Sequence, residues 1–209
     1  MFDRKLRLNV SAFHYDYTDL QVLSVNQQAG SAVPTLGLDN AADATIDGAE
    51  FEATAVPTDW LDLGLNFSIL DATFKNYLSA AIDPVSGLPR DFSGNRLPGA
   101  PKFSLSTFGQ VTVPVGGFDT RWRAEYNYTG KKYYNNAEND LISSGDGYGL
   151  LNLRGALLDP DGRWEIAAWA KNVTDKAYIV DATDTSGFGF VPHYYGERRT
   201  YGVEFRFNF

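Results

Sequence analysis

The sequence predicts an all-β fold of about eight antiparallel up-and-down strands. Three observations predict it: apolar and polar residues alternate along most of the chain, short and long connections follow one another in turn, and no segment shows a 3.6-residue apolar stripe. Successive side chains of a strand point to opposite faces, so the alternation gives each strand one apolar and one polar face.

The eight strands are expected where the two-residue alternation is sustained. They cover residues 5–25, 48–55, 61–69, 102–113, 121–128, 151–157, 163–171 and 201–209. In the first strand the apolar phase changes, because Leu6, Leu8 and Val10 occupy even positions whereas Tyr15 and Tyr17 occupy odd ones. A β-bulge, or a change of environment along the strand, would explain this switch.

The connections are expected to alternate between tight turns and long loops. Pro, Gly and Asp supply fixed or positive φ angles at 57–60, 116–118 and 159–162, which predicts three tight turns there. Long polar loops are expected at 26–41, 78–99, 135–147 and 179–196. Short turns at one end and long loops at the other are typical of outer-membrane β-barrels, and soluble sandwiches lack this asymmetry.

Composition narrows the class of protein further. The 209 residues include no Cys, which excludes disulfides and thiolate chemistry. The net charge of −8 argues against a nucleic-acid partner, because phosphate binding needs a basic surface. No 18 consecutive residues are apolar, so a membrane helix is excluded. The mean hydropathy of −0.28 is nevertheless compatible with a transmembrane barrel, whose strands face lipid only at every second residue.

The last strand carries the most specific pattern of the chain. Its apolar phase is Tyr201, Val203, Phe205, Phe207 and Phe209. This strand resembles the closing strand of bacterial outer-membrane β-barrels, and in those proteins the same pattern is the signal read by the barrel-assembly machinery. The alternative is a terminal edge strand that covers a soluble core.

Aromatic residues are expected to form two bands at opposite strand ends, as in the interfacial girdles of membrane barrels. Toward the long loops lie Tyr15, Tyr17, Phe74, Tyr77, Tyr126, Tyr128, Tyr133 and Tyr134. Toward the short turns lie Trp60, Phe118, Trp164, Phe207 and Phe209.

Four motifs occur in an order that resembles the C-terminal portion of the barrel of TonB-dependent outer-membrane receptors. They are 40–52 with Gly-Ala-Glu-Phe-Glu, 94–101 with Gly-Asn-Arg-Leu-Pro, 169–178 with Asn-Val-Thr-Asp, and 196–202 with Gly-Glu-Arg-Arg-Thr-Tyr-Gly. The resemblance covers nearly all of 1–209, although Arg198 stands where that family usually has Pro. No signal peptide precedes the first strand, so a fragment of a longer receptor is expected, without its plug domain and earlier strands.

The resemblance implies an antiparallel transmembrane β-barrel segment with short periplasmic turns and long extracellular loops. It implies energised uptake of a ferric siderophore or a similar scarce nutrient, with a plug domain and the TonB system as partners of the full-length protein. Outer-membrane lipid and the assembly machinery are further expected partners, and no cofactor is expected. The alternatives are a self-contained eight-stranded outer-membrane barrel with a structural or diffusion role, and a soluble β-sandwich that is a binding module or a glycan-active enzyme.

No catalytic or metal-binding constellation is recognisable, so the chain is not expected to be an enzyme. His14 and His193, the two histidines, are far apart in the sequence. Charged residues in the polar phase are expected to line a wet lumen, since each would cost about 2–4 kcal/mol at mid-bilayer on the lipid face. This wall comprises Glu50, Glu52, Arg121, Arg123, Glu125, Arg154, Glu165, Glu204 and Arg206, with Arg163 and Lys171 in the same phase.

Aromatic residues of the long loops are the expected ligand contacts, because aromatic rings stack on flat ligands. They are Tyr133, Tyr134, Phe188, Phe190, His193, Tyr194 and Tyr195.

Overall fold

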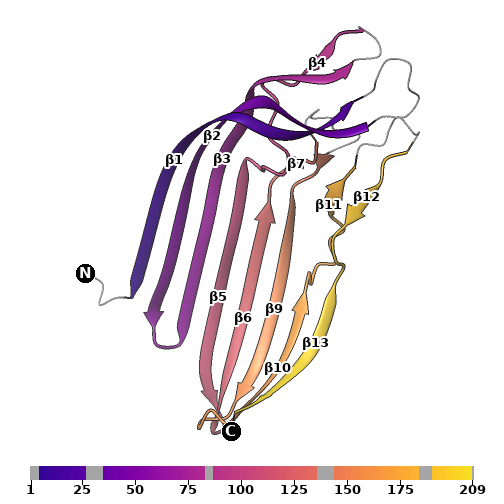
Figure 1. The fold of residues 1–209 in the computed structure, drawn as a ribbon. Coiled ribbons are helices and arrows are strands. Elements are labelled where there is room, and N and C mark those ends of the chain that lie inside the picture. Colours follow the sequence, from indigo (N-terminus) through magenta and orange to yellow (C-terminus); the bar gives the residue numbers. More distant parts are fainter. Residues whose placement is uncertain (1–4, 27–34, 83–86, 136–143, 184–189, 209) are drawn as a thin grey trace.

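Eight long strands form one antiparallel sheet in which each strand pairs with its neighbours in sequence (Figure 1). The computed structural model describes residues 5–26, 35–82, 87–135, 144–183 and 190–208. In sheet order the strands are β1 (Leu6–Asn26), β2 (Thr35–Thr58), β3 (Leu61–Ile82), β5 (Phe103–Val115), β6 (Phe118–Thr129), β9 (Tyr148–Leu158), β10 (Trp164–Lys171) and β13 (Thr200–Phe207). The expected all-β, up-and-down arrangement is confirmed. The sheet is open, with β1 and β13 at its two edges.

The three predicted tight turns are present at one end of the sheet. Two residues separate β2 from β3, and Gly116 and Gly117 alone separate β5 from β6. These glycines have φ angles of 60° and 88°, the left-handed values that a two-residue hairpin turn requires. At the third turn the backbone N–H of Arg163 donates to the Asp159 carboxylate at 3.1 Å.

The four predicted long loops are wrong in part, because strand pairing continues into them. β2 begins at Thr35, and β3 runs to Ile82. Shorter strands follow: β4 (Pro89–Asp91) pairs with β3, β7 (Lys132–Tyr133) with β8 (Ser144–Gly145), and β11 (Ile179–Ala182) with β12 (His193–Tyr195). Pairing satisfies backbone groups that a loop would leave to water, and polar composition alone does not reveal it.

The phase change in β1 comes from a change of environment. The β1–β2 register is unbroken from Leu6 to Tyr17, and the bulge lies beyond Tyr17, where Asp19 has a φ of 55°. Past this point β1 and β2 bend away from the direction of the other strands (Figure 1). Over this unbroken part of the register, even-numbered residues keep to one face, which is apolar from Leu6 to Ala12 and polar at His14 and Asp16.

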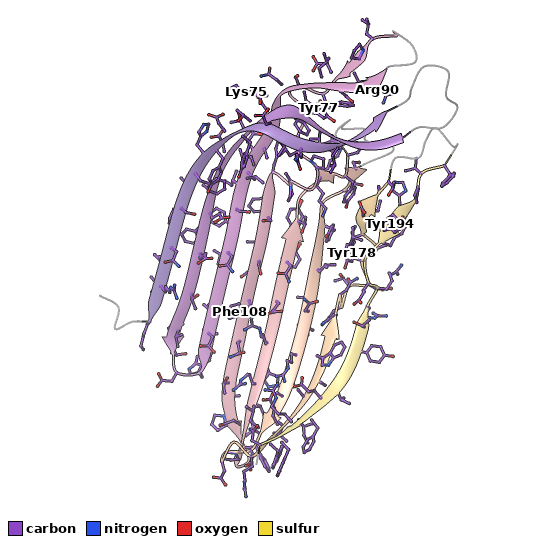
Figure 2. The ribbon with its side chains drawn as sticks, in the orientation of Figure 1. Lys75, Tyr77, Arg90, Phe108, Tyr178 and Tyr194 are labelled. Carbon is purple, nitrogen blue, oxygen red and sulfur yellow. The ribbon has the colours of Figure 1, made fainter. Side chains whose placement is uncertain are left out.

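A small core lies at the bent end of the sheet, between β1, β2 and β3. Val22, Ala42, Phe74 and Tyr77 are buried there, and Leu20, Phe92 and Leu97 pack against them. Figure 2 shows Tyr77 in this region. Elsewhere the sheet is a single layer, so many of its large side chains stay exposed, although Ala156 and Ala167 are buried.

The core corrects part of the predicted aromatic band. Phe74 and Tyr77 are each only 2% exposed, with ring centroids 4.9 Å apart, so neither contributes to a surface girdle. Tyr15 and Tyr17 lie on the opposite face from Leu8 and Val10, because their positions in β1 are odd. The part of the chain that the structure describes contains no helix long and apolar enough to cross a membrane.

Candidate functional site

The register places the charged residues of the predicted wall on one face of the sheet, here named the polar face. Arg123 of β6 is the partner of Arg154 of β9, and Glu165 of β10 is the partner of Arg206 of β13. The other members stand at even spacing from these along their own strands. They are Arg121 and Glu125 on β6, Glu204 on β13, and Glu50 and Glu52 on β2.

Most charges on the β6–β13 side of the polar face form ion pairs, and those of Arg154 cross from β9 to β10 and β13. The Arg154 guanidinium lies 2.5 Å from Glu165 and 3.7 Å from Glu204, and Arg206 lies 3.0 Å from Glu204. Arg123 contacts Glu125 at 2.6 Å and stacks over the Phe108 ring at 3.7 Å. Pairing compensates part of the cost of holding charges on a half-buried wall.

Arg163 departs from the predicted set. Its guanidinium lies 2.9 Å from both Asp159 and Asp161, so it closes the turn before β10 instead of joining the ladder. Because Asp159 and Arg163 are four residues apart in one turn, Arg163 pairs with Asp159 more readily than with a residue of another strand.

The β1–β5 side of the polar face is acidic and hydroxyl-rich. Glu52 accepts a hydrogen bond from Asn9 at 3.1 Å, and Glu50 accepts one from Ser11 at 3.5 Å. Among the described residues, neither carboxylate has a Lys, Arg or His within 4.0 Å. They border an open hollow of about 320 Å³ together with Asn66, Ser68, Ser104 and Ser106.

The opposite face, here named the apolar face, exposes large side chains on most of the main strands. Val203 is 83% exposed and Tyr201 is 79% exposed; other exposed members are Leu8, Val10, Leu63, Ile69, Trp122, Leu153, Ile166, Phe205 and Phe207. Four of the five residues of the predicted assembly signal, Tyr201 to Phe207, lie on this face, and Phe209 lies outside the described residues.

Polar and aromatic groups mark the two limits of the apolar face. At the short-turn end Phe118 and Trp164 pack with their ring centroids 5.6 Å apart. At the other end His14 contacts Asp47 at 2.7 Å and Asp16 at 3.2 Å, and all three side chains are more than half exposed. An exposed apolar band between such limits is typical of the lipid-facing surface of a membrane barrel.

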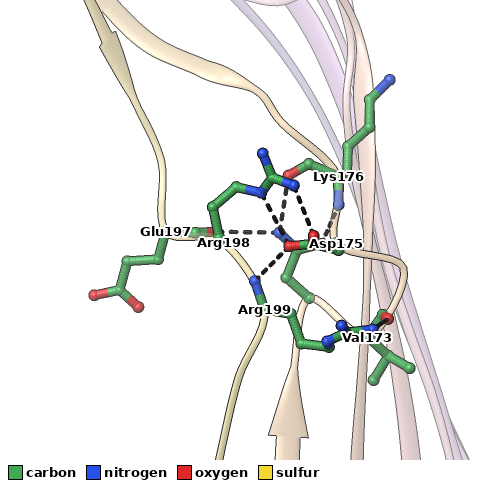
Figure 3. Close-up of polar contacts among 7 residues, drawn as sticks. Val173, Asp175, Lys176, Glu197, Arg198 and Arg199 are labelled. Atoms are coloured by element: carbon green, nitrogen blue, oxygen red, sulfur yellow. Dashed lines mark hydrogen bonds and ion pairs between the residues drawn. The ribbon is translucent and has the colours of Figure 1, made fainter.

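A cluster of side chains joins the segment that leaves β10 to the segment that enters β13 (Figure 3). Asn172 is buried; its Nδ2 donates to the carbonyl oxygens of Lys176 at 2.9 Å and Glu197 at 3.1 Å. Asp175 accepts from Arg198 Nε at 2.9 Å, from Arg198 Nη2 at 2.6 Å and from the Arg199 backbone N–H at 3.0 Å. This cluster, named the neck, bridges the gap between the β10–β13 ladder and the β11–β12 hairpin.

The neck contains two unusual backbone conformations and one bidentate ion pair. Asn172 and Asp175 have φ angles of 48° and 54°, a left-handed region that Asn and Asp tolerate best among residues with side chains. Hydrogen bonds from Arg198 and the Arg199 backbone hold the pKa of the Asp175 carboxyl far below its usual range. Arg198 was the departure from the family pattern, and here it supplies the principal contact of Asp175.

The structure places the described members of the predicted ligand contacts in two regions, one at β7 and one at β12 and the residues before it. Tyr134 is half-buried and donates to the Ile179 carbonyl at 2.6 Å, and burial raises the pKa of its phenol to about 12. His193, Tyr194 and Tyr195 lie on β12, where Tyr195 is 64% exposed (Figure 2 shows Tyr194). Phe190 is also exposed, and Phe188 lies outside the described residues.

The sequence did not predict three cationic side chains that stack on the rings of Tyr133 and Tyr134. Arg96 and Lys131 lie 5.0 and 5.3 Å from the centroid of the Tyr133 ring, and Lys132 lies 5.2 Å from that of Tyr134. The run Lys131-Lys132-Tyr133-Tyr134 was a local signal for two of them, because cations and rings two residues apart on a strand share a face. Within the described ranges no group of three His, Cys, Asp or Glu residues is placed to hold a metal ion.

One antiparallel sheet with an exposed apolar face and an ion-paired polar face defines the fold as a segment of a transmembrane β-barrel. The family described as "TonB dependent receptor-like, beta-barrel" matches residues 1–173. The chain therefore belongs to the TonB-dependent receptor-like β-barrels, a family of receptors.

Solved receptor structures share this fold. The ferric yersiniabactin uptake receptor FyuA from Yersinia pestis is similar over 99% of this chain, with a TM-score of 0.78 and 19% identity. The siderophore receptor PiuA from Acinetobacter baumannii is similar over 97%, with a TM-score of 0.69 and 17% identity. The outer-membrane ferripyoverdine receptor of Pseudomonas aeruginosa is similar over 99%, with a TM-score of 0.65 and 15% identity. The chain spans 28%, 26% and 25% of the lengths of these three receptors.

Proposed function

We propose that residues 1–209 are the C-terminal part of the barrel of an outer-membrane transporter that takes up a ferric siderophore or a similar scarce nutrient. The observation that carries this proposal is the division of one sheet into an exposed apolar face and a polar face crossed by ion pairs. The apolar face suits lipid, and the polar face suits a wet lumen. The activity moves the ligand and leaves its covalent structure unchanged.

The polar face supports the lumen assignment through its energetics. Arg154 is only 28% exposed, and it pairs with two carboxylates from β10 and β13. A charge at mid-bilayer on the lipid side would cost about 2–4 kcal/mol, so a ladder of this density requires water or protein opposite it. The nine wall residues are therefore proposed to face the interior of the barrel.

The asymmetry of the connections supports an orientation. The tight turns are proposed to be periplasmic and the long hairpins extracellular, as in outer-membrane barrels. Tyr133, Tyr134, Phe190, His193, Tyr194 and Tyr195 then lie at the extracellular mouth of the barrel, and Phe188, outside the described residues, belongs to the same proposed set. They are the proposed ligand contacts, and the siderophore receptors named above support the ligand class.

The open sheet supports a larger barrel as the setting of this chain. β1 presents a 21-residue edge and β13 an 8-residue edge, and unpaired edges promote association with other strands. Further strands of the same receptor are proposed to pair with both. A plug domain inside the barrel, the TonB system and the barrel-assembly machinery are the proposed protein partners.

Iron uptake by cells that carry the full-length receptor tests this function. We expect uptake of ⁵⁵Fe from a ferric siderophore panel that stops when TonB is deleted or a protonophore is added. Protein of the outer-membrane fraction should show a heat-modifiable band. Equal uptake with and without TonB would instead indicate passive diffusion and would overturn the proposal.

A further inference from the structure

An open hollow of about 480 Å³ lies on the polar face over β6, β9, β10 and β13. One row of the register crosses it, with Arg123 opposite Arg154, Arg154 opposite Trp169, and Trp169 opposite Gly202. Lys171 lies one step further along β10 on the same face. The hollow therefore combines a tryptophan floor with three cationic side chains and with the carboxylates of Glu125 and Glu204.

The floor exists because β13 has no side chain beneath the indole. A Cβ atom at Gly202 would lie 2.6 Å from the Trp169 ring, so the ring occupies the space above this glycine. Ala167, the next polar-face residue toward the short turn, is buried and small. This arrangement keeps the indole against the wall and leaves the volume above it open.

The three cationic side chains around the hollow differ in whether they form ion pairs. Arg123 is paired with Glu125, and Arg154 is paired with Glu165 and Glu204. Lys171 is exposed, and its ammonium lies 5.5 Å from the centroid of the Trp169 ring. Among the described residues it has no carboxylate within 4.0 Å. Lys171 is thus the cation of this hollow that remains able to bind an anion.

We propose that this hollow, named the wall site, binds an anionic ligand with a planar group as the ligand passes through the barrel. The inference rests on the proposed transport function and adds a site below the mouth. Lys171 would contact the anionic group, and the Trp169 ring would stack on the planar one. Clefts of roughly 300–1,000 Å³ with an apolar floor and a few polar groups are typical of small-molecule sites, which favours a small ligand over a protein segment.

Charge-selective uptake by cells that carry the full-length receptor tests the wall site. The probes are a trianionic ferric tris-catecholate and a neutral ferric tris-hydroxamate, both labelled with ⁵⁵Fe. Lys171→Gln should lower the uptake rate of the anionic probe about tenfold, the factor for loss of one charge-assisted contact. Binding of that probe to chilled, de-energised cells should remain unchanged. Lys171→Arg should preserve uptake, because it keeps the charge.

Arg7→Gln is the matched control, because Arg7 lies on the polar face of β1, outside the wall site. Equal uptake of the anionic probe by Lys171→Gln and Arg7→Gln would overturn the wall site while leaving the transport function intact. Uptake of the neutral probe alone by the wild-type receptor would also overturn the wall site. So would a Lys171→Gln receptor that is cleaved faster by protease but takes up the anionic probe at the wild-type rate, because this result would indicate that a protein segment docks there. A wild-type receptor without TonB-dependent uptake of any ferric siderophore would refute the transport function itself.

Discussion

The guanidinium group of Arg198 donates two hydrogen bonds to the carboxylate of Asp175, at 2.9 Å from Nε and 2.6 Å from Nη2. The two residues are 23 positions apart, and they lie on the segments that lead into β11 and out of β12 (Figure 3). The β10–β13 ladder ends at Lys171 and Thr200, so this pair continues the connection between the arms where backbone pairing stops. The neck is therefore one of the connections between the hairpin and the main sheet, beside the hydrogen bond from Tyr134 to the Ile179 carbonyl.

Replacing Arg198 by Pro, the usual residue of the family, should loosen the hairpin. The Arg199 backbone N–H still donates to Asp175, but both guanidinium contacts are lost. We expect faster proteolytic nicking within residues 179–196 and an unchanged heat-modifiable barrel. Arg199→Ala is the comparison, since Arg199 offers its side chain only a 3.4 Å contact with the Val173 carbonyl. Equal nicking rates in wild type and Arg198→Pro would show that the ion pair does not hold the hairpin.

Acid should release the neck only at low pH. The pKa of Asp175 is lower in the folded state than in the unfolded chain, so its contribution is complete above the unfolded value of about 3.9 and is lost as pH falls through the folded value. Hydrogen exchange of the hairpin should therefore be flat from pH 8 to pH 5 after correction for intrinsic rates. Asp175→Asn should abolish the acid-dependent increase below that range. If the midpoint of the acid-dependent increase in hydrogen exchange lay near neutral pH, Asp175 would not be the group that titrates.

Adding one methyl group at Gly202 should destabilise the barrel. The new Cβ would lie 2.6 Å from the Trp169 ring, and overpacking of this kind costs about 1–3 kcal/mol. The control is Gly109→Ala, where the new Cβ would lie 3.7 Å from Leu63, an ordinary contact. Denaturant unfolding in detergent measures both, and Trp169→Ala should rescue Gly202→Ala. Equal stabilities of the two alanine variants would contradict the close approach.

A charge on the apolar face should cost far more than one on the polar face. Val203 is 83% exposed, and Val203→Arg should destabilise the barrel in lipid by about 2–4 kcal/mol if the position lies near mid-bilayer. Ser106→Arg places the same charge on the polar face of β5 and should be nearly neutral. Unfolding from liposomes compares them, and equal losses would refute the assignment of the two faces.

The last residue should affect assembly. Phe209→Asp in the full-length receptor removes the final aromatic residue of the predicted assembly signal, so less folded protein should reach the outer membrane. Phe207→Tyr, which keeps an aromatic ring, is the control. The amount of heat-modifiable protein in the membrane fraction measures the effect, and unchanged amounts would exclude a role for Phe209 in the signal.

Much of the sheet was predictable because its signals are local. The alternation in Trp122 to Tyr128 and in Tyr201 to Phe207 assigns each side chain to a face without knowledge of any partner strand. Gly116 and Gly117 predict a tight turn by themselves, because their residue type permits positive φ. The hairpins β7–β8 and β11–β12 were less predictable, because a polar sequence is compatible with both a loop and a solvated strand.

The sequence by itself therefore determined the eight-stranded alternation, the two faces, the tight turns and the family. Tertiary structure decided which groups meet: Arg154 reaches Glu165 and Glu204, Arg198 reaches Asp175, and Trp169 covers Gly202. It also decided that Phe74 and Tyr77 form a core instead of a girdle. The physical reason is that side-chain periodicity is a property of one strand, whereas register, bulges and long-range contacts depend on how separate strands pair.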